Sequence, residues 1–191
     1  NRRSRGLGDV YKRQRIYSII IFKNMSDNYS LILKNGSCYI DGKLTKADLG
    51  LSGKKIKKIG KIELNSSKVF DATNKVILPG IIDTQVHFRE PGSTDAEDLE
   101  SGSRAAVLGG VTSLFEMPNT NPPTSNLVEF EKKLQLAKDR MHSNYAFYFG
   151  ATPENTEQLS QLKNLKGCCG IKLFAGSSTG NLLVDKEADI E

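Results

Sequence analysis

The sequence of 191 residues contains no tryptophan, only two histidines and only three cysteines. The cysteines are Cys38, Cys168 and Cys169, an odd number with an adjacent pair and no Cys-x-x-Cys spacing. This pattern does not provide the paired cysteines of a disulfide framework, so we expect a reduced, cytoplasmic protein.

Long apolar runs are missing as well. Residues 16–22, IYSIIIF, form an apolar run of seven residues, far fewer than the roughly 20 that a membrane-spanning helix needs. A basic stretch precedes this run, as in a signal peptide, but no small-residue cleavage site follows it. The sequence therefore predicts no membrane partner.

A net positive charge is missing from most of the chain, although the whole chain has a net charge of +5. Residues 1–24 carry seven Lys or Arg and one acid, which leaves residues 25–191 at −1. We therefore expect no nucleic-acid partner. Residues 1–24 follow no structural period and are interpreted as an upstream or non-native leader with the start of the protein at Met25. A targeting sequence is the alternative.

The remaining chain divides into two regions by pattern. Residues 25–78 show short strands with the turn dipeptides Asn35-Gly36 and Asp41-Gly42, each predicted to form a hairpin. Lysines among these strands, at 54, 55, 57 and 58, are expected to be solvated. From Lys75 onward, four apolar, β-rich segments alternate with helical stretches; they are VILPGIID, VTSLFEMP, YAFYFGA and CCGIKLF.

Helix starts are marked by polar residues. Thr94 with Glu97 forms a predicted capping box, Asn126 with Glu129 repeats its spacing, and Thr152-Pro153 places proline at a first helical position. One face of the second helix is expected in the core: Leu127, Phe130, Leu134, Ala137 and Met141. Strands alternating with helices predict a parallel sheet, either doubly wound or part of a (β/α)8 barrel, which needs about 250 residues when complete.

Candidate functional residues follow the predicted strands. Gln85 and His87 are two residues apart and share one side of a strand, an arrangement in which two histidines would form a good metal site. A single histidine there fits packing or hydrogen bonding as well. Arg89 could bind a substrate carboxylate or form a surface ion pair. Asn119 could point into the same site or serve only to form a turn or a cap. Lys172 lies in an apolar strand, where it either reaches solvent or has a lowered pKa that lets it react as a neutral amine.

Three segments together carry a family resemblance: PGIIDTQVHFREPG, EDLESGSRAAVLGGVTSLFEMPNTNPPT and GIKLFAGSSTGN. In their order and spacing they closely resemble dihydroorotase, of the cyclic amidohydrolase family, over residues 29–191. FREPG together with MPNTNPPT favours dihydroorotase over allantoinase, hydantoinase or dihydropyrimidinase.

The resemblance implies a partial (β/α)8 TIM barrel, about its first four strands in residues 79–191, preceded by strands of a small β-sandwich in residues 25–78. It implies a zinc-dependent hydrolase that converts dihydroorotate to N-carbamoyl-aspartate in pyrimidine synthesis, and a homo-oligomer when full length. His87 matches the second histidine of the family's HxH motif, and Lys172 matches a lysine that becomes a metal-bridging carbamate in many members. Arg89 and Asn119 match the groups that hold the substrate carboxylate.

Two departures from the family pattern qualify this prediction. Gln85 stands where the first histidine of HxH is expected and is a weak ligand, so one zinc is favoured over two. The family's remaining ligands and its catalytic aspartate would lie beyond Glu191, so no catalytic residue is assigned within the chain, which is interpreted as an inactive, truncated fragment. The alternatives are an inactive scaffold subunit that partners aspartate carbamoyltransferase, or an allantoinase- or hydantoinase-type hydrolase.

Overall fold

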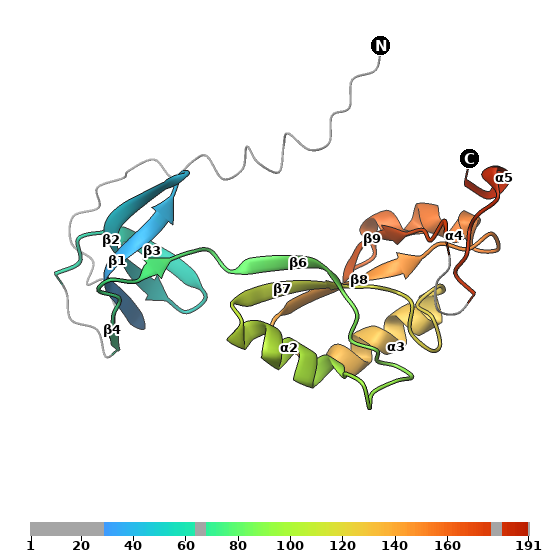
Figure 1. Ribbon diagram of the computed structural model, residues 1–191, viewed down its shortest axis with the longest axis horizontal. Coiled ribbons are helices and arrows are strands. Elements are labelled where there is room, and N and C mark those ends of the chain that lie inside the picture. The colour runs from blue at the N-terminus through green and yellow to red at the C-terminus, as the bar shows by residue number, and fades with distance from the viewer. Residues whose placement is uncertain (1–28, 64–67, 177–180, 191) are drawn as a thin grey trace, which may run out of the picture. The chain divides into compact units, whose positions relative to one another are not determined.

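The computed structural model describes residues 29–63, 68–176 and 181–190, and the chain divides into two compact units, Asn1–Leu78 and Pro79–Glu191 (Figure 1). The predicted leader, residues 1–24, lies outside the described residues. No helix in the described part of the chain is long and apolar enough to cross a membrane.

The first unit is a five-stranded sheet in the order β3-β2-β1-β4, with β5 also paired to β1. Antiparallel pairs join β1 to β2 and β2 to β3, whereas β4 and β5 run parallel to β1. The strands are β1 (Leu31–Ile40), β2 (Lys43–Ser52), β3 (Lys55–Gly60), β4 (Val69–Asp71) and β5 (Val76–Ile77). A small core of Tyr29, Ile32 and Ile62 packs on this sheet.

Only one of the two predicted hairpins forms. Asp41-Gly42 turns the chain from β1 into β2, with both residues at positive φ. Asn35-Gly36 instead lies inside β1, where the register with β2 shifts between Leu33 and Gly36. Asn35 has a φ of 64°, and its N–H donates to the side chain of Asp48 at 2.9 Å. The dipeptide therefore forms a bulge, because β1 continues through it to pair with both halves of β2.

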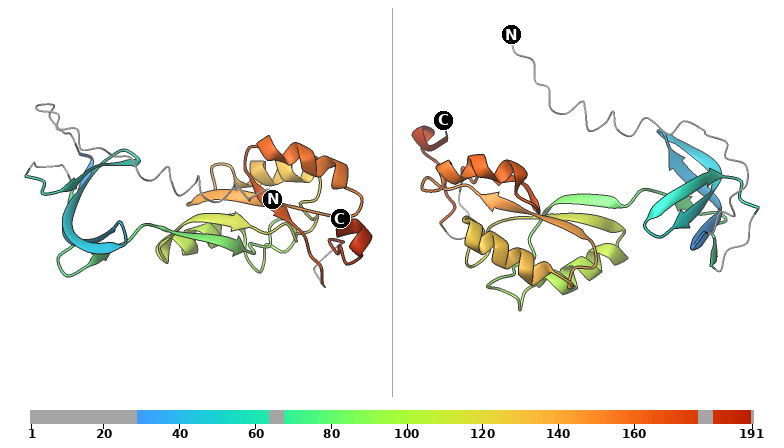
Figure 2. Two further views of the ribbon diagram at one scale, coloured as in Figure 1. Left: turned by 90° about the horizontal axis from the view of Figure 1, so that it is seen from above. Right: turned by 180° about the vertical axis from the view of Figure 1, so that it is seen from behind.

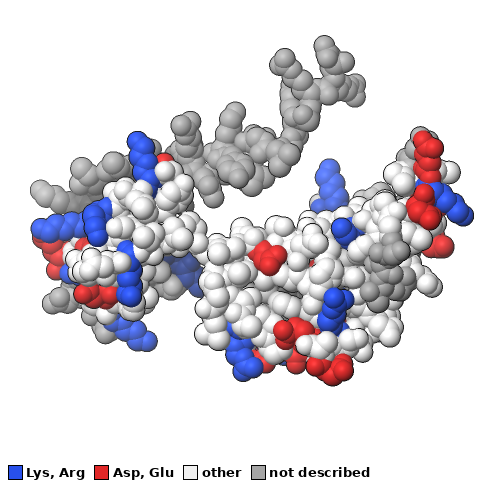
Figure 3. All heavy atoms as spheres, in the orientation of Figure 1, with Lys and Arg blue, Asp and Glu red and all other residues white. Residues whose placement is uncertain are grey.

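Several basic side chains lie on the face of this unit that Figure 3 shows. The predicted solvated lysines are all exposed: Lys54, Lys55, Lys57 and Lys58.

The second unit contains a four-stranded parallel sheet in the order β6-β7-β8-β9, with helices in the connections (Figures 1 and 2). The four predicted strands are thus present, as β6 (Ile81–Val86), β7 (Val111–Glu116), β8 (Asn144–Gly150) and β9 (Cys168–Lys172). The helical elements are α2 (Leu99–Leu108), α3 (Leu127–Ala137), α4 (Thr156–Leu159), the 3-10 helix η1 (Ser160–Asn164) and α5 (Glu187–Ile190).

The core of this unit lies between the sheet and its helices. Phe147 and Phe149 alternate along β8 and contact Phe130 of α3, with ring centroids 6.5 and 6.3 Å away. Burial of each such side chain stabilises the fold by roughly 1.5–3 kcal/mol. The full cluster is Phe88, Leu99, Leu114, Phe130, Ala137, Phe147, Phe149 and Leu162. The opposite face of the sheet carries an edge-to-face contact between Phe115 and Tyr148.

Helix α2 begins later than its predicted capping box. Asp98, not Thr94, is the N-cap: its side chain accepts the N–H of Ser101 at 2.7 Å. The carboxylate of Glu90 accepts the N–H of Leu99 at 2.9 Å and satisfies a second free donor of the first turn. Two carboxylates therefore place the helix start at residue 99, and Gly109-Gly110 ends the helix.

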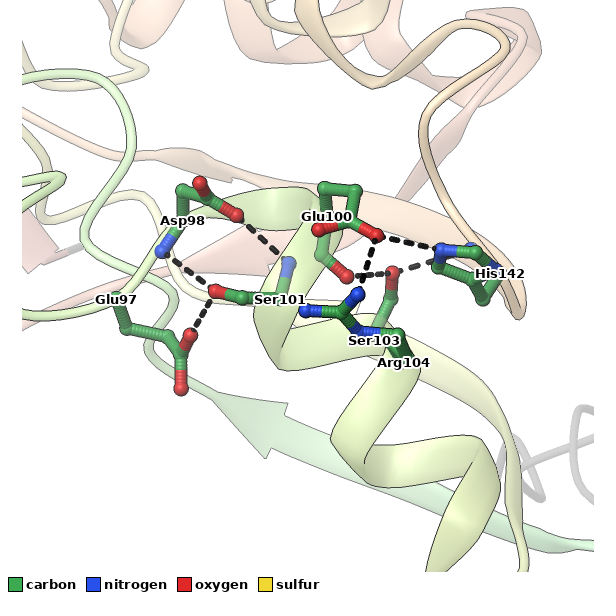
Figure 4. A network of polar contacts seen from close by, with 7 residues as sticks. All are labelled: Glu97, Asp98, Glu100, Ser101, Ser103, Arg104 and His142. Atoms are coloured by element: carbon green, nitrogen blue, oxygen red, sulfur yellow. Dashed lines mark hydrogen bonds and ion pairs between the residues drawn. The ribbon is translucent and has the colours of Figure 1, made fainter.

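A polar network ties the start of α2 to the turn before β8 (Figure 4). Nε2 of His142 lies 2.8 Å from the Glu100 carboxylate, and the backbone N–H of His142 donates to Ser103 Oγ at 3.1 Å. The Ser103 hydroxyl in turn donates to the Glu100 carbonyl. These contacts give His142, the second histidine of the chain, a structural position.

The remaining helix predictions are mixed. The side chain of Asn126 caps α3 by accepting the N–H of Glu129, as expected. The predicted start at Thr152-Pro153 is wrong, because the buried side chain of Asn155 accepts the Thr152 N–H and α4 begins only afterwards. Leu127 is also exposed rather than in the core, and the buried face of α3 contains Lys133 in addition to Phe130 and Ala137.

Candidate metal and substrate site

The predicted site residues follow the carboxyl ends of parallel strands. His87 follows β6, Asn119 lies three residues beyond the end of β7, and Lys172 is the last residue of β9. Since the strands are parallel, these ends lie along one edge of the sheet, which is where ligands bind in α/β proteins.

His87 and Asn119 meet directly. Nδ1 of His87 lies 3.0 Å from Oδ1 of Asn119, across 32 positions of sequence. With its proton on Nδ1, the imidazole donates to this amide oxygen and keeps the lone pair of Nε2 free for a metal. Asn119 thus has a contact that sequence alone does not predict: it orients the candidate ligand.

The surroundings of His87 favour its neutral form. Partial burial lowers the pKa of His87, and the positive charges of Arg89, Lys172 and Lys133 lower it further, whereas the hydrogen bond to Asn119 opposes them. Neutral imidazole is the form that binds metals. The Arg89 guanidinium also suits an anionic substrate group, so the electrostatics of this edge fit both predicted roles.

Gln85 lies on β6 with an exposed side chain, and its backbone N–H donates to the carboxylate of Asp83 at 2.9 Å. The half-buried Lys172 places its ammonium 5.0 Å from the ring centroid of Phe174. This contact between a cation and an aromatic face gives the lysine a defined place beside the strand ends.

Arg89 lies in a loop that packs on the loop carrying Asn119. The loop bends sharply, with a φ of 47° at Arg89 and 112° at Gly92. Asn121 N–H donates to the Pro91 carbonyl at 3.0 Å, and a side chain at Gly92 would meet the backbone of Asn121 at 2.5 Å. Glycine is therefore required at residue 92 by both its φ and the close approach of the second loop.

Two ion pairs behind these loops were not predicted, and the first of them is fully buried. Nζ of Lys133 on α3 lies 2.7 Å from Oε2 of Glu116, and both side chains are about 1–2% exposed. Burial raises the pKa of Glu116 to about 7 against the opposing effect of the Lys133 ammonium, and burial lowers the pKa of Lys133.

The second pair joins Glu90 and Arg140 through contacts of 2.7 and 3.1 Å. A periodicity could have indicated one of these residues: Lys133 lies three positions after Phe130 and four before Ala137, on the apolar face of α3.

The metal site is incomplete among the described residues, which contain no group of three or more His, Cys, Asp or Glu placed to hold an ion. His87, in an environment that favours its neutral form, fits a zinc ligand, but it supplies only one of the three or four ligands that zinc needs. Any zinc bound here needs ligands in addition to those described.

Comparisons with known proteins agree with the fold. L-hydantoinase (dihydropyrimidinase) from Arthrobacter aurescens superposes with a TM-score of 0.74 and 28% identity, over 82% of this chain and 35% of that one. The parallel sheet and its helices therefore form a half-barrel, part of a (β/α)8 TIM barrel of the hydantoinase type, which confirms the predicted fold class.

The family follows from sequence. A family model described as Dihydro-orotase-like matches residues 74–180. Dihydroorotase from Methanosarcina mazei is 39% identical over 161 residues, covering 83% of this chain and 35% of that protein. Allantoinase from Desulfitobacterium hafniense is 38% identical over 150 residues, covering 78% of this chain and 33% of that protein. The chain belongs to the dihydroorotase-like family of amidohydrolases, and it spans about a third of the length of these curated relatives.

Proposed function

We propose that the protein containing this chain is a dihydroorotase: a zinc-dependent hydrolase that opens the cyclic amide of dihydroorotate to give N-carbamoyl-aspartate. The observation that carries the proposal is the contact between His87 and Asn119 at the strand ends, in loops with the sequences FREPG and MPNTNPPT. Relatives of both the dihydroorotase and the allantoinase type match at similar identity, so the choice of substrate rests on these two loops.

Arg89 and Asn119 are proposed to hold the substrate carboxylate. A guanidinium can bind both carboxylate oxygens, and the carboxamide of Asn119 can donate its N–H2 while its oxygen contacts His87. The contact between the two loops, through Asn121 and Pro91, keeps these groups together. Dihydroorotate has a carboxylate, whereas hydantoin and allantoin have none, so this pair would determine specificity.

Zinc is proposed to bind Nε2 of His87 and Lys172 in its carbamate form, with Gln85 as a weak ligand. A bound zinc polarises an amide carbonyl and lowers the pKa of a water molecule. The uncharged imidazole of His87 is ready for this role without loss of a proton, and Asn119 holds its ring in place. No catalytic residue is assigned within the chain.

The test is the product of the complete gene that contains these residues. It is expected to hydrolyse dihydroorotate in preference to hydantoin and allantoin, and Arg89→Met is expected to raise KM for dihydroorotate at least about tenfold, because a bidentate ion pair is lost. Preference for either of the other two substrates would overturn the assignment. We expect one tightly bound zinc per subunit, and two stoichiometric ions by metal analysis would contradict the proposed effect of Gln85.

Gln85 favours one alternative of a different class: an inactive subunit that supports aspartate carbamoyltransferase. The two readings differ in residues beyond this chain. An active enzyme requires further histidine ligands and an aspartate base, and a scaffold subunit does not. The protein is further proposed to be cytoplasmic and, when full length, a homo-oligomer.

A further inference from the structure

Helix α3 contacts both loops of the candidate site through two cations. Lys133 reaches the loop of residues 117–124, and Arg140, just beyond the helix, binds Glu90 in the loop that carries Arg89. Lys133 is the more unusual of the two, because its side chain is 1% exposed and that of Arg140 is 37% exposed.

The first loop-holding contact is made by the Lys133 ammonium. Nζ donates to the Met117 carbonyl at 3.3 Å and lies 3.5 Å from Oγ1 of Thr120, so the cation approaches the residues on both sides of Pro118 and Asn119. The Thr120 hydroxyl in turn donates a hydrogen bond to the Pro122 carbonyl at 2.9 Å. A buried ammonium needs such acceptors as well as a counter-charge.

The counter-charge comes from Glu116, the last residue of β7, whose carboxylate lies 2.7 Å from Nζ. The backbone N–H of Phe88 lowers the pKa of the same carboxylate, and the Met117 N–H donates to the Val86 carbonyl at 3.0 Å. Glu116 pairs with Val86 at the end of β6, one residue before His87, and directly precedes the 117–124 loop.

We propose that Glu116 and Lys133 are a positioning pair that holds the 117–124 loop against the end of β6 and so sets the contact between Asn119 and His87. Neither residue touches the proposed substrate position, and both act through Asn119. An apolar pair of similar volume would fill the same space beside Phe130 and Phe147, but it would leave the Met117 carbonyl and the Thr120 hydroxyl without the cation. The effect of the Glu116–Lys133 pair on catalysis rests on the function proposed above.

The experiment compares Lys133→Met with Glu116→Leu/Lys133→Met in the 191-residue chain. Lys132→Met is the matched control, since Lys132 is the neighbouring residue of α3 but is exposed and paired with Glu129. Unfolding by urea measures stability, and hydrogen exchange measures protection of the 117–124 segment, where Thr120 and Thr124 N–H groups both donate to Pro118.

Lys133→Met alone is expected to lower stability, because it leaves the buried Glu116 carboxylate without its cation. The double variant is expected to recover stability, yet both variants are expected to exchange the 117–124 amides at least about tenfold faster than the wild type and the control. A double variant that regains both stability and wild-type protection would show that the pair only fills space and would overturn the proposal. If Lys133→Met does not fold, the double variant decides.

In the complete gene product, the double variant is expected to raise KM for dihydroorotate at least about tenfold with a smaller change in kcat, because the substrate carboxylate contact is misplaced. Equal KM values would contradict the role of the pair in positioning Asn119. Hydrogen exchange needs no substrate, so a wild-type protein without dihydroorotase activity would end the proposed function and leave the test of the pair intact.

Discussion

At the scale of single residues, the candidate site combines one strong candidate ligand, His87, with one weak candidate, Gln85. His87 has a neutral-favouring environment and a hydrogen-bonded partner in Asn119. Gln85, two positions earlier, offers only a neutral amide oxygen, which zinc binds far less well than imidazole. We therefore expect the identity of residue 85 to decide how many metal ions this edge binds.

Gln85→His is expected to tighten zinc binding by the chain at least about tenfold, or ~1.4 kcal/mol, because a second imidazole joins that of His87. Competition with a zinc chelator measures this change. Gln161→His, which adds a histidine at an exposed position of η1, is the control. Equal affinities for the two variants would contradict the pairing of residues 85 and 87.

Glu116 predicts a pH dependence of stability. Burial raises its pKa from 4.5 to about 7, so the folded chain retains a proton that the unfolded chain loses within this range. The free energy of unfolding should therefore fall as pH rises from about 4.5 to 7, by about 3 kcal/mol at most. Urea unfolding between pH 4.5 and 8 should show a smaller decline for Glu116→Gln. Parallel curves for wild type and variant would refute the assignment.

At the scale of elements, the helix caps show how neighbours decide between similar sequence signals. Thr94 and Asp98 both precede the apolar part of α2 at a distance that suits a cap, and the sequence favours Thr94 through its spacing to Glu97. Asp98 is used because Glu90, fixed by Arg140, accepts the Leu99 N–H and so places the first turn. The choice of N-cap therefore depends on Arg140, which lies just beyond the end of α3.

Asp98→Ala is expected to lower the free energy of unfolding by about 1 kcal/mol, since a capping hydrogen bond is lost. Thr94→Ala is expected to change it by less than about 0.5 kcal/mol, because Thr94 is exposed and lies outside the helix. Urea unfolding of the two variants tests this pair. A larger loss of unfolding free energy for Thr94→Ala than for Asp98→Ala would support Thr94 as the N-cap, as the sequence predicted.

At the scale of the whole molecule, the sheet of the second unit leaves apolar side chains on its outer strands exposed: Ile81 and Ile82 on β6, and Ile171 on β9. The barrel family that the chain belongs to closes such a sheet with further strands. The candidate metal site of this half-barrel is also incomplete. The described residues bring together His87, Asn119 and nearby cations, but no complete set of metal ligands.

The 191-residue chain is therefore expected to lose zinc on dialysis against a chelator and to show no hydrolysis of dihydroorotate, because neither a full ligand set nor a catalytic base is assigned within it. Metal analysis and a spectrophotometric assay check the two expectations. Turnover by purified residues 25–191, free of the complete protein, would overturn the interpretation of the chain as an inactive part.

The sequence by itself determined the family, the four parallel strands and the residues that follow them, because these depend on local patterns: apolar β-rich runs, glycine and proline turns, and motifs in a fixed order. Only the tertiary structure decided that Asn35-Gly36 forms a bulge, that Asp98 caps α2, and that Lys133 is buried against Glu116. Each of these outcomes depends on partners that are distant in the sequence, and the stability of a buried charge or a strained turn is set by the neighbours that the fold brings to it.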